Sequence, residues 1–185
     1  MFKPPIAACA IAALASYVQA QSLDHSGMDP SKIDHAAHMK VMTDALRQAE
    51  VSERGKDVMP FSLAATTHVF TKTAEGGTQK VVAKKPTDTA QVKLARHHLQ
   101  EIRERFLKGD FSGPSHIHGQ DMPGLAELKA AKRGQVVIDY KDVKGGGQLT
   151  YKTADAALVA ALHRWFDAQL SDHGKDAKAG HAHLG

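Results

Sequence analysis

Histidine and methionine recur near the N-terminal end in two similar units. The first is Asp24-His25-Ser26-Gly27-Met28, and the second is Asp34-His35-Ala36-Ala37-His38-Met39, with Met42 close behind. Imidazole and thioether are neutral ligands that suit copper, because soft sulfur selects Cu(I) and imidazole serves both oxidation states. We therefore expect a copper-binding set of six side chains: His25, Met28, His35, His38, Met39 and Met42.

The segment that carries these units, residues 21–58, is polar and has no aromatic residue. It can bury little apolar surface, so we expect a mobile arm. Residues 33–54 have helix-compatible spacing but too few apolar residues to fold firmly alone. An amino-terminal Cu(II) claw is excluded, because it needs histidine at the third mature position and Leu23 stands there. The alternative is a soluble linker that contains histidines without a metal role.

A second candidate site combines His68, His116 and His118 with Met122. His68 shares one face of a predicted strand with Phe70, because side chains alternate along a strand. His116 and His118 belong to a predicted loop over residues 109–122, where an extended pair would place both rings on one side. The alternative is a hydrogen-bonded core role for His68 and an exposed loop for the other two.

Four further histidines have structural interpretations. His98 and His163 fall at the edges of apolar helix faces and are expected to pack there. His97 should face solvent. His173 ends the last predicted helix, where a positive imidazolium would compensate the helix dipole.

The first 20 residues have the pattern of a cleavable secretory signal. Lys3 precedes an uncharged run over residues 6–18, and small residues flank a cleavage point before Gln21. We expect a periplasmic protein with no transmembrane segment after cleavage. A lipoprotein signal at Cys9 fails on position, because too few apolar residues precede that cysteine. Cys9 is the only cysteine, so its removal excludes thiolate catalysis and cysteine-based metal sites.

Charge and motifs narrow the function classes further. The formal net charge is only +4, with acidic and basic residues interspersed, which argues against a nucleic-acid partner. The chain has no nucleophile-elbow, phosphate-loop, dinucleotide or zinc-protease motif. This favours a protein that is not an enzyme, although an unrecognised enzyme remains an alternative.

The hydrophobic patterns predict a small α+β fold. Two hairpins with glycine-rich turns are expected, and the helix over residues 89–108 has apolar residues at spacings of three and four. The predicted strands cover 66–73, 78–84, 135–142 and 148–153, and the predicted helices cover 89–108, 123–132 and 155–170. The order ββααββα favours a two-layer sandwich with a mainly antiparallel sheet and flexible tails at both ends.

Four regions follow from these patterns. Residues 1–20 are the signal peptide and residues 21–58 the mobile arm. Residues 59–174 form the α+β domain, and residues 175–185 form a flexible tail that contains histidine.

Two resemblances can be read from the motifs. The paired units at Asp24 and Asp34 resemble the Met/His repeats of periplasmic copper-resistance proteins. The domain is similar to a family of exported proteobacterial proteins without an established activity. The motifs that carry this similarity are Met59-Pro60-Phe61, Thr67-His68-Val69-Phe70, His118-Gly119, Asp121-Met122-Pro123-Gly124-Leu125 and His163-Arg164-Trp165-Phe166-Asp167-Ala168-Gln169. Some members are labelled aspartate carbamoyltransferase, but this chain is too short for that enzyme and lacks its Ser-Thr-Arg-Thr phosphate loop.

Together these observations predict a periplasmic metal-binding protein that captures, stores or delivers copper, as Cu(I) or Cu(II). Its partners would be the metal ion and another periplasmic copper protein. The alternative is a domain that binds a small ligand or haem, or catalyses a reaction, at the face of His68, His116 and His118.

Overall fold

A computed structural model of the chain describes residues 34–181. Residues from Ala36 onward form one compact unit; the residues before it are a separate unit, of which only Asp34 and His35 are described. The elements are α1 (His35–Gly55), η2 (Leu63–Ala65), β1 (Thr66–Thr73), β2 (Gly76–Ala83), α2 (Thr89–Leu107), α3 (Ser112–His118), α4 (Leu125–Ala130), β3 (Val137–Val143), β4 (Gly146–Lys152), α5 (Ala156–His173), η3 (Gly174–Asp176) and β5 (Ala177–Ala179).

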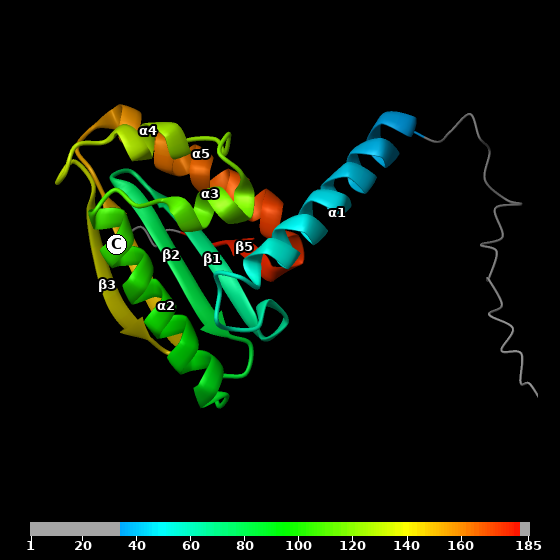
Figure 1. Cartoon of the computed structure of the whole chain (residues 1–185), viewed down its shortest axis with the longest axis horizontal. Coiled ribbons are helices and arrows are strands. Elements are labelled where there is room, and N and C mark those ends of the chain that lie inside the picture. The colour runs from blue at the N-terminus through cyan, green and yellow to red at the C-terminus, as the bar shows by residue number, and fades with distance from the viewer. Residues whose placement is uncertain (1–33, 182–185) are drawn as a thin grey trace, which may run out of the picture. The chain divides into compact units, whose positions relative to one another are not determined.

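The five strands form one sheet in the order β3-β4-β2-β1-β5 (Figure 1). All neighbours are antiparallel except β5, which runs parallel to β1. The predicted α+β class with a mainly antiparallel sheet is therefore confirmed. The predicted order ββααββα corresponds to β1, β2, α2, α4, β3, β4 and α5.

Gly77 in β2 allows the first hairpin to form. Its φ is 159°, and a Cβ there would collide with the carbonyl oxygen of Thr71 and the ring of Phe166. Only glycine lets the backbone of β2 come this close to its neighbours. The tight hairpin then aligns β1 with β2 over their whole lengths.

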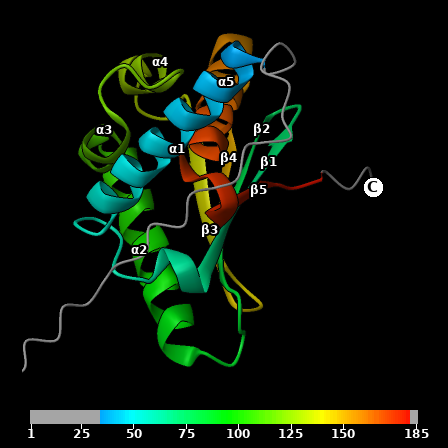
Figure 2. The ribbon, with the colours of Figure 1, turned by 90° about the vertical axis from the view of Figure 1, so that its right-hand side faces the viewer.

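The helices cover one face of the sheet (Figure 2). Alternate residues of the strands point into this layer, among them Phe70 of β1, Val81 of β2 and Leu149 of β4, and all three are buried. The apolar faces of α2 and α5 pack on them through Leu99 and Trp165. Burying side chains of this size stabilises the fold by roughly 1.5–3 kcal/mol each, which fixes the side of each helix that faces the sheet.

Two segments differ from their predicted state. Residues 112–118, expected as part of an extended loop, form helix α3, so that prediction is wrong. The helix was hard to detect because it is short and contains Gly113 and Pro114, although proline is tolerated in a first turn. Residues 177–179, assigned to a tail without periodic structure, form β5 and extend the sheet beside β1.

Helix α1 lies within the segment predicted as an arm. The second half of α1 packs on the domain, where Val51 and Gly55 are buried. The first half is exposed on all sides through residue 43. The apolar contacts that hold the helix are therefore confined to its C-terminal end.

No helix within residues 34–181 is long and apolar enough to cross a membrane. The predicted signal peptide, residues 1–20, lies outside the described residues.

Candidate functional site

Five histidines from four different elements line one cavity of about 320 Å³. We call this cavity the histidine pocket. His68 comes from β1, His98 from α2, His116 and His118 from α3, and His173 from α5. Apolar side chains complete its wall, among them Met59, Ile102, Phe106, Ile117 and Trp165.

The secondary structure explains how each ring reaches the pocket. His68 alternates with Phe70 on the inner face of β1, which is the face the helices cover. His173 ends a buried stripe of α5 that includes Trp165 and Gln169 at helical spacing of four residues. His98 lies next to Leu99 on the buried side of α2.

The rings of His68, His173 and His118 are in direct contact. His68 stacks on His173 with centroids 4.7 Å apart and an interplanar angle of 5°. His118 meets the same His173 ring edge-on at 5.1 Å. Phe61 then joins His68 to His98, with centroid distances of 5.7 Å and 5.4 Å. The cluster is continuous, and His173 is at its centre.

His118 is fixed by a charged network. Its Nδ1 lies 2.8 Å from Oδ2 of Asp172, and Arg47 holds that carboxylate through Nε at 3.0 Å and Nη2 at 2.8 Å. Burial alone would raise the pKa of Asp172, but the hydrogen bonds from His118 and Arg47 outweigh it and lower the pKa to about 2. An ionised carboxylate can only accept, so Nδ1 of His118 carries the proton. This leaves Nε2 as the ring nitrogen available to a ligand.

His68, His98 and His173 are neutral at pH 7. Burial lowers the pKa of His98 to about 4, with Arg105 and His97 adding to the effect. Burial likewise lowers the pKa of His173 to about 4, with a further contribution from His118. Burial and the neighbouring His173, His98 and His118 lower the pKa of His68 well below its usual value. The pocket therefore offers three uncharged imidazoles, each with one N–H donor and one acceptor nitrogen.

Two buried polar atoms in side chains that line the pocket have no protein partner within the described part of the chain. They are Nδ1 of His68 and the indole Nε1 of Trp165, in side chains that are only 3% and 1% exposed. Burying such a group without a hydrogen bond costs about 1–3 kcal/mol. A lone acceptor or donor of this kind is a common mark of a site that receives a ligand or an ordered water.

Three of the four residues of the predicted second site line the pocket: His68, His116 and His118. His173 bridges the rings of His68 and His118. His116 is exposed and pairs with Asp57, another lining residue, with Nε2 and Oδ2 3.2 Å apart, while Met122 is buried in the core and does not line the cavity. His116 and His118 differ in exposure because residues two apart on a helix point in different directions, whereas on a strand they would share a side.

The sequence indicated another role for His173 than the one it has in the structure. His173 was expected to carry a positive charge at the helix end, but burial keeps it neutral, so that interpretation is wrong. Extending the apolar stripe of α5 from Trp165 and Gln169 by one more turn would have identified His173 as an inward residue. His98 does pack as predicted, and His97 is exposed as predicted.

The predicted copper ligands fall partly outside the described residues. His25 and Met28 precede residue 34. His35, His38, Met39 and Met42 belong to α1 and are exposed, with Met39 at 63% and Met42 at 50%. Within residues 34–181, no group of three or more His, Cys, Asp or Glu side chains is arranged to hold a metal ion.

Comparison with family models, with curated proteins and with solved structures gives no match for this chain.

Proposed function

We propose that this protein binds a small, uncharged molecule with an apolar body and a hydroxyl group in the histidine pocket. One observation carries the proposal: the indole N–H of Trp165 and Nδ1 of His68 are buried and unpartnered within the described residues, and both side chains line this cavity. A hydroxyl group both accepts and donates, so it can accept from the indole N–H and can pair with Nδ1 of His68 in either tautomer.

The rest of the pocket fits such a ligand. Ile102, Phe106 and Ile117 supply apolar contacts. The imidazoles of His68, His98 and His173 are neutral, and the charged side chains in the lining, Asp57, Glu101 and Arg105, carry both signs, so the lining does not favour a ligand of one charge. The cavity of about 320 Å³ lies near the lower end of the range for ligand pockets, which favours a small molecule over haem.

Phenol, with toluene as its control, tests this proposal. Trp165 is the only tryptophan, so its indole N–H gives a single side-chain signal in a proton–nitrogen correlation spectrum. Millimolar phenol should shift that signal in a saturable way, and toluene, which has the same shape without the hydroxyl, should bind more weakly. His68→Leu should weaken phenol binding about fivefold, the value of one hydrogen bond.

His97→Leu on the exposed side of α2 is the matched control and should leave phenol binding unchanged. Equal affinity for phenol and toluene would contradict the proposal, and so would an indole signal that neither compound moves.

A second function, copper capture by the N-terminal segment of an exported protein, is favoured by a different observation. His38, Met39 and Met42 lie within about one turn of α1, and all three are exposed. They have no apolar packing role that would explain two methionines there. Their residue types, with His25, Met28 and His35 before them, suit copper in either oxidation state.

Copper titration of the secreted protein tests this second function. Changing His25, His35 and His38 to alanine together should remove most of the bound copper, while His97→Ala with His116→Ala should not. Binding should weaken in acid, because a coordinating imidazole must be neutral. Unchanged copper stoichiometry in the triple variant would contradict the proposal. An intact mass that begins before Gln21 would contradict export with cleavage after Ala20.

A further inference from the structure

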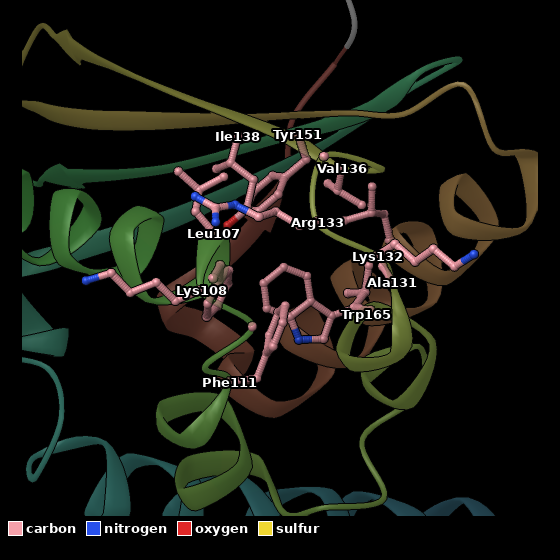
Figure 3. A pocket seen from close by; sticks show the side chains of 15 residues that line it. Leu107, Lys108, Phe111, Ala131, Lys132, Arg133, Val136, Ile138, Tyr151 and Trp165 are labelled. Carbon is pink, nitrogen blue, oxygen red and sulfur yellow. The ribbon is translucent and has the colours of Figure 1, made fainter.

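A second cavity, of about 370 Å³, lies on the other side of Trp165 and Phe106, which line both cavities. We call it the cationic pocket. Its floor is apolar: Tyr151 and Ile138 come from the sheet, Phe111 from the residue that precedes α3, and Trp165 from α5 (Figure 3). Unlike the histidine pocket, it has no histidine in its lining.

The rim of the cationic pocket carries three positive side chains, Lys108, Lys132 and Arg133. In Figure 3 the guanidinium of Arg133 extends over the apolar floor toward Leu107 and Ile138, and the two lysines stand on either side with their ammonium groups turned outward. Within residues 34–181 none of these three side chains has an ion pair or hydrogen bond, and no acidic residue lines the cavity.

The grouping of these cations around one apolar cavity distinguishes the rim. Elsewhere in residues 34–181 about half of the basic side chains face a carboxylate, as Arg96 faces Asp142 and Arg164 faces Glu127. Three unpaired cations around an apolar cavity without any acid leave positive charge with no partner. A ligand that carries one negative group and an apolar body would complement both parts.

We infer that the cationic pocket binds an organic carboxylate, with its apolar body on the floor formed by Phe106, Tyr151 and Trp165 and its carboxylate at Arg133. A guanidinium matches a carboxylate through two parallel hydrogen bonds, whereas the lysines add charge from flexible stems. This inference does not depend on the proposed function, because it concerns a different cavity and a ligand of opposite character.

A comparison of octanoate with octanol separates the contribution of the ligand's negative charge to binding from that of its apolar tail. Trp165 is in the wall of the cavity, so its fluorescence should change as octanoate fills the pocket, and calorimetry should give a stoichiometry of one. Octanol, with the same tail and no charge, should bind more weakly. Octanoate affinity should also fall as salt concentration rises, because the rim is open to solvent.

Variants at the rim test the role of the cations. Lys132→Gln with Arg133→Gln should weaken octanoate binding about tenfold, since exposed charge pairs contribute modestly one by one. Octanol binding should not change. Lys144→Gln, in the β3–β4 turn and outside the pocket, is the matched control and should bind octanoate normally.

Ala131→Phe is a second, independent test, because it fills the cavity without altering its charge. It should abolish calorimetric binding of octanoate while phenol still shifts the indole signal. Equal binding of octanoate and octanol by the unchanged protein would overturn the inference. So would full octanoate affinity in both the double charge variant and the filled variant.

Discussion

Two groups of histidines in this protein have opposite surroundings. His35 and His38 lie on the exposed first half of α1, next to exposed methionines. His68, His98 and His173 are buried around a cavity and are held neutral by burial. The same residue type is thus available to a metal ion in solution at one place and is part of the folded core at the other.

The comparison separates two meanings of a histidine-rich composition. An exposed imidazole contributes little to stability, so its presence points toward binding. A buried imidazole must fit the folded core. Because burial keeps it neutral, the free energy of unfolding decreases as the pH drops. The predictions below test this difference, beginning with the effect expected to be largest.

Acid should destabilise the domain through the buried histidines. In the folded state the pKa of His98 is about 4, against 6.5 for a free side chain, so the unfolded chain takes up a proton first. Above pH 6.5 His98 does not reduce the free energy of unfolding. Between pH 6.5 and about pH 4 that free energy falls by on the order of 3 kcal/mol because of this group alone. Urea unfolding at several pH values measures the loss.

His98→Gln should reduce that acid loss, because glutamine does not titrate. His97→Gln, one residue away on the exposed side of α2, should leave the loss almost unchanged. If both variants lose stability equally between pH 6.5 and 4, His98 is not held neutral by burial.

Asp172→Asn should have the next largest effect. It removes the carboxylate that both Arg47 and His118 contact, and it should cost roughly 2 kcal/mol at pH 7, less than a fully buried pair because Arg47 is partly exposed. The pKa of Asp172 is lowered to about 2, so this contribution is present above pH 3.8 and is lost between pH 3.8 and 2.

Asp167→Asn on the same helix is the control, since Asp167 pairs with Lys72 at the surface. Its cost should be below about 0.5 kcal/mol. Chemical denaturation of the two variants side by side measures the difference, and equal costs would refute a special role for the network of Asp172.

Substitutions on the exposed half of α1 should have the smallest effect. Met39→Ser with Met42→Ser should change the free energy of unfolding by less than about 0.5 kcal/mol. Val51→Ala, in the buried half of the same helix, should cost roughly 2 kcal/mol. A large loss from the methionine changes would show that they pack in the folded state, and it would weaken the argument for a metal role.

Much of the fold could be predicted because its signals are local. The hairpin glycines, the apolar spacing of α2 and the stripe of α5 depend on near neighbours in the chain, and the strands at 66–73 and 146–152 lie within a few residues of their predicted positions. The short helix α3 gave no such signal, since Gly113 and Pro114 are poor helix formers inside a helix. Its formation depends on the burial of Phe111 and Ile117 in the core.

The sequence by itself determined the order of the main elements, the inward direction of His68 and the concentration of histidine and methionine before residue 43. Only the tertiary structure decided that His118 and His173 join His68 in a buried cluster while His116 stays exposed to solvent beside Asp57. It also decided that Asp172 and Arg47, 125 residues apart, together hold the imidazole of His118 in place. Periodicity tells which side of an element is buried, but which buried sides meet depends on contacts between distant parts of the chain, and these form only when the layers pack.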